Sequence, residues 1–127
     1  MRIYGIGTDV ININRIKKSL KNNNFIIRLF NKDEIKKCNS QANKANCYAK
    51  RFAAKEAFSK AIGTGISKGI NFNEIIVYNI KSGKPGIKLL GNTKKKVNKI
   101  INKKKINIFL SLSDDKPFAI ATVVISI

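Results

Sequence analysis

The chain has 127 residues, 26 of them Lys or Arg and 7 Asp or Glu, which gives a formal net charge of +19. This length suits one domain with a hydrophobic core, and this charge attracts acidic or phosphorylated partners. Histidine is absent, which excludes Ser-His and Cys-His nucleophilic pairs and histidine-ligated zinc.

The first predicted strand covers residues 2–10, where apolar residues alternate with glycines. Asp9 lies at its end. A carboxylate in this place either caps the following helix, whose N-terminus favours negative charge, or acts as a metal ligand. Both interpretations stay open at this point of the chain.

The next predicted helix has Ile13, Ile16 and Leu20 at helical spacing on its apolar side. Its other side is basic and carries Arg15, Lys17, Lys18 and Lys21. A short apolar segment at residues 25–30 then holds Arg28.

Asn31 and Glu34 have the spacing of a capping box and predict the start of a short helix that ends near Cys38. Asp33 and Glu34 in its first turn are explained by helix electrostatics. Residues 39–46 are expected to form a polar loop.

The two cysteines, Cys38 and Cys47, belong to no CxxC motif. Free thiols in a reducing cytosol are favoured over a lone disulfide. No apolar run approaches the roughly eighteen residues that a membrane span needs, and the N-terminal segment does not resemble a signal peptide. We therefore expect a cytoplasmic, soluble protein with no membrane partner.

The segment RFAAKEAFSKAIGTGI at residues 51–66 predicts the central helix, which begins near Lys44 or Cys47 and ends at Ile62. Gly63 and Gly65 supply the permissive backbone that ends such a helix.

One face of this helix places Phe52, Glu56 and Lys60 above one another, with Ser59 beside them. The simpler interpretation is a surface Glu–Lys pair, which adds about 0.2–0.5 kcal/mol. The alternative is a site for an anion and a metal ion.

The C-terminal half predicts more strands than helices. The expected elements are a strand at 74–80, a turn at 81–86, a paired strand at 87–90, a helix at 92–102 with Val97, Ile100 and Ile101 inward, and two central strands at 106–113 and 118–127 joined by a turn at 114–117. The predicted class is α+β, a single domain over residues 1–127 with a mixed or antiparallel sheet packed on the long central helix.

The seven acids are few enough to be sorted one by one. Helix capping accounts for Asp33 and Glu34. Turn formation is the simpler interpretation of Asp114 and Asp115 and is favoured for Asp115, while Glu74 heads a strand with no partner in view. Asp9 and Glu56 remain. Two carboxylates from distant segments are a usual protein contribution to a Mg²⁺ site, and Ser59, Lys60 and the Gly-Thr-Gly backbone suit a diphosphate.

Two motifs carry a resemblance to a known family. GIGTDV at residues 5–10 fits G-[IL]-G-x-D, and RFAAKEAFSKAIGTGI fits F-[AS]-x-K-E-[AS]-x-x-K. Together with GKP at residues 83–85 and the closing SLSDD…FAIATVVI, the chain resembles the holo-[acyl-carrier-protein] synthases, the small type of 4′-phosphopantetheinyl transferase. The resemblance covers essentially the whole chain.

This resemblance implies a fold, a reaction and a set of residues. The family moves the phosphopantetheine arm of coenzyme A to a serine of acyl carrier protein and releases adenosine 3′,5′-bisphosphate. It implies Asp9 and Glu56 as Mg²⁺ ligands and Lys60 as the residue that neutralises the diphosphate. Either Glu56 or a metal-bound water would accept the serine proton.

The resemblance also implies contacts with both substrates. The expected coenzyme A contacts are Arg51, Ser59, Lys60, Gly63, Thr64, Gly65, Lys84 and Pro85. The expected contacts with the acidic carrier protein are Arg15, Lys21 and Arg28. A homotrimer with active sites between subunits is also implied.

Two positions depart from the family pattern: Asp114 stands where many members have histidine, and Asn12 stands where an acid is usual. The rival hypothesis is a basic nucleic-acid-binding module, which the charge alone suggests. The chain has no recognisable nucleic-acid motif and no tryptophan, so a transferase without a nucleic-acid partner is favoured.

Overall fold

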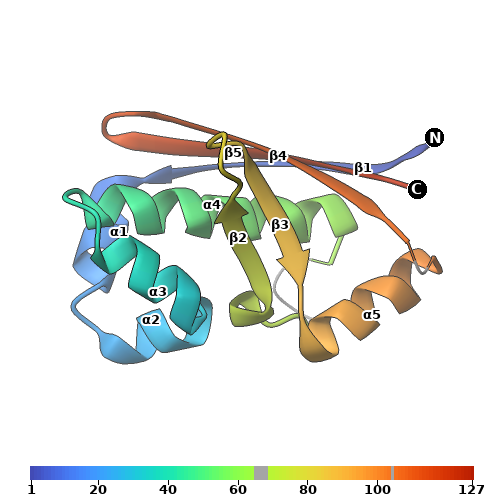
Figure 1. Ribbon diagram of the computed structural model, residues 1–127, viewed down its shortest axis with the longest axis horizontal. Helices are drawn as coiled ribbons and strands as arrows, with labels where there is room; N and C mark the ends of the chain where they lie inside the picture. Colours follow the sequence, from blue (N-terminus) through green and yellow to red (C-terminus); the bar gives the residue numbers. More distant parts are fainter. Residues whose placement is uncertain (65–68, 104) are drawn as a thin grey trace.

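The computed structural model describes residues 1–64, 69–103 and 105–127. A three-stranded antiparallel sheet lies along one long helix, α4 (Lys44–Ile62), and a two-stranded hairpin crosses in front of that helix in the view of Figure 1. The predicted α+β class and the antiparallel sheet on a central helix are confirmed.

The larger sheet has the order β1–β5–β4. Its strands are β1 (Ile3–Asn12), β4 (Asn107–Asp115) and β5 (Phe118–Ser126). Only β5 is central, because its two neighbours pair with it from either side. The expectation that both C-terminal runs are central strands is therefore wrong for β4, which is an edge strand among the residues described.

The turn between β4 and β5 is shorter than predicted. Asp114 pairs with Ala119 inside the ladder, and only Lys116 and Pro117 form the turn. Asp114 accepts a hydrogen bond from Asn46 at 3.1 Å and lies 3.5 Å from the Lys50 ammonium, so it binds side chains of α4 instead of making a turn. Asp115 ends the strand beside the turn.

Two glycines allow α4 to lie directly against β1. A Cβ on Gly5 would overlap the carbonyl oxygen of Ala61, and one on Gly7 would overlap that of Ala57. Four residues of helix advance about 6 Å and two residues of strand about 6.6 Å. Every second residue of β1 on this face therefore meets the next turn of α4. The alternation then directs the side chain of Asp9 toward the same helix.

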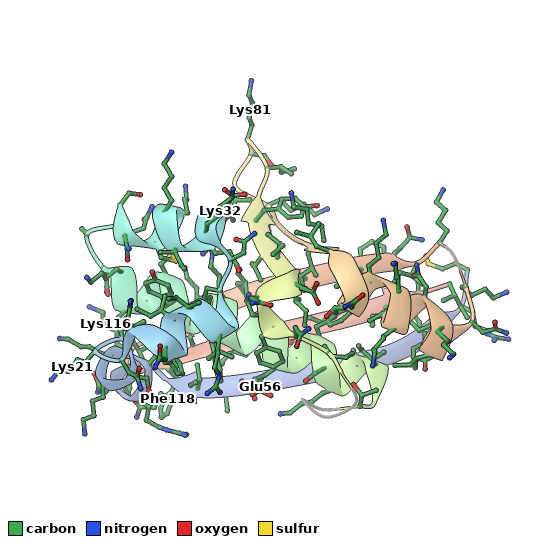
Figure 2. All side chains as sticks on the ribbon, turned by 90° about the horizontal axis from the view of Figure 1, so that it is seen from below. Lys21, Lys32, Glu56, Lys81, Lys116 and Phe118 are labelled. Atoms are coloured by element: carbon green, nitrogen blue, oxygen red, sulfur yellow. A yellow bond between two sulfur atoms is a disulfide. The ribbon has the colours of Figure 1, made fainter. Side chains whose placement is uncertain are left out.

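The smaller sheet consists of β2 (Ile75–Asn79) and β3 (Pro85–Leu89), preceded by the 3₁₀ helix η1 (Phe72–Glu74). This hairpin corresponds to the strand pair predicted on either side of the Gly-Lys-Pro turn. Figure 2 shows Lys81 projecting from the tip of the hairpin, far from Glu56.

Four shorter helices complete the fold: α1 (Ile13–Ser19), α2 (Asn23–Leu29), α3 (Lys32–Asn39) and α5 (Gly91–Ile101). The predicted capping box is confirmed, because the Asn31 side chain accepts from the Glu34 amide while the Glu34 carboxylate accepts from the Asn31 amide. None of the helices in the described ranges is long and apolar enough to cross a membrane.

Helix α5 differs from its prediction in the exposure of Ile100. Val97 and Ile101 are buried as expected, but Ile100 is 38% exposed because it lies on the outer face.

Glu74 was expected to have no partner, which is wrong: its carboxylate accepts from the Asn92 and Thr93 amides and from the Thr93 hydroxyl. Glu74 thus caps the N-terminus of α5, where no side chain at the N-cap position does so.

The cysteines also contradict their prediction. Cys38 at the end of α3 and Cys47 in the first turns of α4 form a disulfide, with 5.3 Å between their Cα atoms, so free thiols are wrong for this structure. The helical start of α4 at Lys44 brings Cys47 back beside α3, which the nine-residue spacing does not reveal.

Candidate active site

The site is built where β1 passes the middle of α4. Asp9 projects from the helix-facing side of β1, and Glu56 and Lys60 project from successive turns of α4. Asn12, three residues after Asp9, caps α1 by accepting from the Asn14 amide at 2.9 Å. The capping alternative for Asp9 is thereby excluded, and its carboxylate is left for the site.

Lys60 contacts β1 across the site. Its ammonium nitrogen lies 3.1 Å from Oδ1 of Asp9 and 3.0 Å from the carbonyl oxygen of Thr8. The Lys60 side chain is half exposed, whereas that of Asp9 is 16% exposed. An ion pair that is open to water on one side contributes little to stability, so the lysine is free to exchange one anion for another.

Glu56 is half-buried next to the same carboxylate. Burial raises the pKa of Glu56 above its ordinary value, the negative charge of Asp9 raises it further, and Lys60 opposes both effects. A carboxylate whose ionisation is made more costly by a neighbouring negative charge marks a place where a positive charge is favoured.

This donor set fits a magnesium ion. Mg²⁺ takes oxygen ligands and is usually held by one or two carboxylates, with water and substrate phosphates completing its octahedron. Asp9 and Glu56 supply the two carboxylates. Among the residues that the structure describes, no cluster of three or more acidic, histidine or cysteine side chains exists, so a cation held by protein ligands alone is not supported.

The end of α4 has the turn that the sequence predicted. Gly63 adopts a left-handed conformation with φ of 86° and caps the helix through its amide, which donates to the carbonyls of Ser59 and Lys60. The Ser59 hydroxyl is fully buried and donates to the Glu56 carbonyl at 2.8 Å, so its side chain faces the helix and not an open cleft. The Thr64 amide also donates to Ser59, and Gly65 lies outside the described residues.

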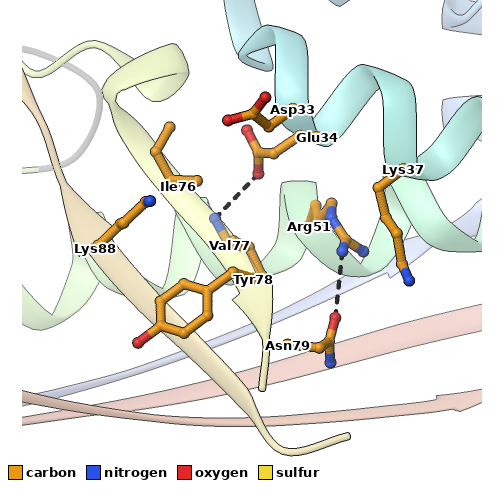
Figure 3. Close-up of a pocket in the computed structure, with 9 residues that line it drawn as sticks. All are labelled: Asp33, Glu34, Lys37, Arg51, Ile76, Val77, Tyr78, Asn79 and Lys88. Atoms are coloured by element: carbon orange, nitrogen blue, oxygen red, sulfur yellow. Dashed lines mark hydrogen bonds between the residues drawn. The ribbon is translucent and has the colours of Figure 1, made fainter. Parts of the chain in front are cut away.

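Arg51 lies on another face of α4 and is only 5% exposed. Its guanidinium donates to Cys47 Sγ at 3.2 Å and to Asn79 Oδ1 at 3.3 Å. Burial lowers the pKa of Arg51, and the charge of Glu34 partly opposes this. Figure 3 shows Arg51 and Asn79 in a cavity of about 250 Å³ that Tyr78 and Lys88 also line.

The remaining predicted residues lie apart from the carboxylates. Lys84 and Pro85 are at the start of β3, beside the hairpin turn, and line a groove with Phe109 of β4. Arg15 on α1, Lys21 after it and Arg28 on α2 are all exposed. The structure therefore brings Asp9, Glu56 and Lys60 together, and leaves the hairpin residues and the three surface cations at separate places.

Sequence reasoning missed Lys55, which is part of the second motif. It is fully buried, and its ammonium donates to Glu34 Oε1 at 2.6 Å and to the carbonyls of Leu29 and Phe72 at 2.7 Å. Burial lowers the pKa of Lys55 to about 8, and the charge of Glu34 opposes this. The signal available in the sequence was a lysine on the alanine-rich inner face of the helix.

Glu34 has a second role that its capping position conceals. Besides the Asn31 and Lys55 bonds, its Oε2 accepts from the Val77 amide of β2 at 3.1 Å (Figure 3). One buried ion pair therefore ties α2, α3, η1 and β2 to the inner face of α4. This fixes the rotation of the helix that presents Glu56 and Lys60.

Comparisons with known proteins agree on one family. The sequence model of the 4′-phosphopantetheinyl transferase superfamily matches residues 5–123. A holo-[acyl-carrier-protein] synthase of Pelagibacter ubique is 49% identical over 125 residues, which cover 98% of both chains.

Solved structures are similar along the whole fold. A holo-[acyl-carrier-protein] synthase from Neisseria meningitidis superposes with a TM-score of 0.86 at 35% identity, covering 98% of this chain and 99% of that one. The synthase from Helicobacter pylori, solved in complex with coenzyme A, gives 0.80 at 34% identity, covering 95% and 99%.

Proposed function

The chain belongs to the 4′-phosphopantetheinyl transferase superfamily, and from this premise we propose that it is a holo-[acyl-carrier-protein] synthase. It transfers the 4′-phosphopantetheine arm of coenzyme A to a serine hydroxyl of apo acyl carrier protein. Adenosine 3′,5′-bisphosphate is released. The reaction depends on Mg²⁺ and serves fatty acid biosynthesis in the cytoplasm.

One observation carries this proposal: Asp9, Glu56 and Lys60 meet from two distant segments at the crossing of β1 and α4. Phosphoryl transfer needs little covalent chemistry from a protein and depends on positioning and on charge stabilisation. Two acids and one half-exposed cation at a single point are suited to that task.

Asp9 and Glu56 would hold the magnesium ion. When bound, Mg²⁺ supplies positive charge to the diphosphate oxygens and orients them for in-line displacement. Lys60 then binds the diphosphate, because its half-exposed ammonium exchanges the carboxylate of Asp9 for the phosphate oxygens at low cost.

The proton of the attacking serine needs an acceptor within hydrogen-bond reach. The Glu56 carboxylate, which lies half-buried beside Asp9, is one candidate acceptor. A water molecule beside Glu56 is the second candidate acceptor.

The two substrates would approach from different sides of α4. Coenzyme A is assigned to Arg51, Ser59, Gly63, Thr64, Gly65, Lys84 and Pro85, which the family motifs contain. The acidic carrier protein is assigned to Arg15, Lys21 and Arg28, whose exposed charges would steer its approach. Similar structures from Bacillus anthracis and Helicobacter pylori are complexes with coenzyme A, which supports coenzyme A as a substrate.

A homotrimer belongs to the same proposal. The sheet face that α4 does not cover carries a row of exposed apolar side chains: Ile6, Val10, Phe109, Phe118 and Ile120. A face of this kind is typical of a protein interface. Light scattering on the purified protein should give three times the chain mass of 14.2 kDa, and a monomer would contradict the trimer.

The transfer itself is tested by mass spectrometry of the carrier. The purified protein is incubated with Mg²⁺, coenzyme A and apo acyl carrier protein. A gain of about 340 Da, the mass of one phosphopantetheine group, is expected. As a positive control, a known transferase must modify the same apo carrier protein. If it does, and this protein leaves the mass of the carrier unchanged, the proposal is refuted.

A further inference from the structure

The disulfide between Cys38 and Cys47 joins two helices beside a charged cavity. Cys38 is fully buried at the end of α3, and Cys47 on α4 is 8% exposed. The bond closes the loop of residues 40–43 between α3 and α4, which is shorter than the predicted loop at 39–46 because α4 begins at Lys44. A cross-link of this kind reduces the conformational freedom of the enclosed chain.

Arg51 connects this disulfide to the interior of the cavity. One guanidinium nitrogen donates to Cys47 Sγ at 3.2 Å, one helical turn away, and another donates to Asn79 Oδ1 at 3.3 Å. Its Nε is buried and has no hydrogen-bond partner among the described residues. Within the described ranges its two bonds go to sulfur and to an amide, and the charge of Glu34 acts on it without a direct bond.

The cavity that Cys47 and Arg51 share has a volume of about 300 Å³ and opens to solvent. Its cations are Lys37, Arg51 and Lys50, of which Lys50 also lies 3.5 Å from Asp114. No acid lines the cavity itself among the residues described. Three of its lining residues, Gln41, Ala42 and Asn43, belong to the loop that the disulfide closes. The shape of an anion-attracting cavity therefore depends on the cross-link.

We propose that Cys38 and Cys47 form a reversible thiol–disulfide modification site that controls the affinity of this cavity for the nucleotide part of coenzyme A. This inference rests on the proposed function, because it takes coenzyme A as the ligand. The disulfide form is the tighter binder, since it holds the loop and the Arg51 side chain in place.

The chemistry requires a dithiol as reductant. One thiolate of the dithiol attacks Sγ of Cys47, the more exposed sulfur, and the Cys38 sulfur leaves with the bonding electrons and takes a proton. The second thiol of the reductant then attacks the mixed disulfide and releases Cys47 as a thiol. Two electrons pass to the protein, which gains two thiols while the reductant becomes a disulfide.

The neighbouring guanidinium raises the fraction of Cys47 that is present as thiolate after reduction, which speeds the return reaction. A cation at hydrogen-bond distance stabilises a thiolate, and the thiolate is the form that attacks disulfides. The reduced Cys47 would therefore react readily with an external disulfide, and Cys38 would close the bond again.

Calorimetry with adenosine 3′,5′-bisphosphate tests this inference, because this probe has no thiol that could reduce the protein. The full chain is measured once after oxidation with a small disulfide and once after reduction with dithiothreitol. Alkylation and mass spectrometry count the thiols in each sample. We expect no free thiol and tighter binding in the oxidised sample, and two thiols with several-fold weaker binding in the reduced one.

The double variant C38A/C47A is the matched control and should bind with the weaker affinity under both conditions. Equal affinities of the oxidised and reduced wild-type protein, or tighter binding after reduction, would overturn the inference, as would two alkylated thiols in the oxidised sample. If neither sample binds the probe and neither modifies the carrier protein, the proposed function itself fails. If the protein transfers phosphopantetheine but its affinity for adenosine 3′,5′-bisphosphate is the same with and without the disulfide, the proposed function stands and only the thiol–disulfide control is refuted.

Discussion

Lys60 pairs with Asp9 across the site, with 3.1 Å between Nζ and Oδ1, and not with Glu56, its neighbour one turn earlier on α4. The simple interpretation of the helix, a surface Glu–Lys pair at i and i+4, is therefore wrong within the described part of the chain. Glu56 is left beside Asp9 with a raised pKa. In the proposed function, both acids and the lysine are parts of one site that would bind a cation and an anion together.

Lys60→Ala should lower kcat by about 100-fold, because one preorganised charge at a phosphoryl-transfer site is worth about that much. Steady-state assays with coenzyme A and carrier protein measure this. Lys99→Ala on α5 is the control, since it removes the same charge from an exposed position in the last turn of that helix. A loss of similar size in both variants would show that only the net charge matters.

Gly7→Ala should destabilise the fold by about 1–3 kcal/mol, the usual cost of overpacking. The new Cβ would overlap the carbonyl oxygen of Ala57, so β1 must move away from α4 and carry Asp9 with it. Urea denaturation gives the stability. Thr8→Ala on the exposed face of the same strand should change stability far less, and equal losses would contradict the close approach of strand and helix.

Lys55→Met should lower the free energy of unfolding by about 3–5 kcal/mol, because it leaves the Glu34 carboxylate buried and uncompensated. The double variant E34Q/K55M should recover part of this loss, since it removes both charges. Denaturant unfolding of Lys55→Met, Glu34→Gln and the double variant gives the three losses in free energy of unfolding. A loss in the double variant equal to the sum of the two single losses would show that the pair does not act as a unit.

Glu74→Gln should make the protein less sensitive to acid. The Thr93 hydroxyl, followed by Asn71 and the amides of Thr93 and Asn92, holds the pKa of Glu74 below its ordinary value of 4.5. The ionised carboxylate therefore stabilises the fold above pH 4.5, and this contribution disappears as the pH falls through the lower folded pKa. Thermal melts should show a stability difference between wild type and variant at pH 7 that shrinks in acid, and a constant difference would contradict the cap.

Local signals in the sequence predicted much of this fold. The capping box of Asn31 and Glu34, the left-handed Gly63 and the extent of α4 each depend on neighbours within one turn, and all three are confirmed. The class and the hairpin followed from the same kind of pattern.

Features that depend on contacts between distant segments were predicted poorly. The pairing of Glu34 with Lys55, the strand position of Asp114 and the joining of Cys38 to Cys47 all arise from the way α3 and β4 pack on α4. Asp9 and Glu56 were selected from the sequence because local explanations were available for Asp33, Glu34, Asp114 and Asp115. The turn explanation for Asp114 and the expectation that Glu74 has no partner both proved wrong. Asp9 and Glu56 come close together because Gly5 and Gly7 let β1 lie directly against α4.

Turnover by Glu56→Gln tests the central claim most directly. The variant keeps the size of the side chain and removes the negative charge of Glu56, which together with Asp9 would hold the metal ion. Mass spectrometry of the carrier protein, with circular dichroism to show an intact fold, should reveal almost no phosphopantetheine transfer. Activity within a few-fold of wild type would show that Glu56 is only a carboxylate on the surface of a helix.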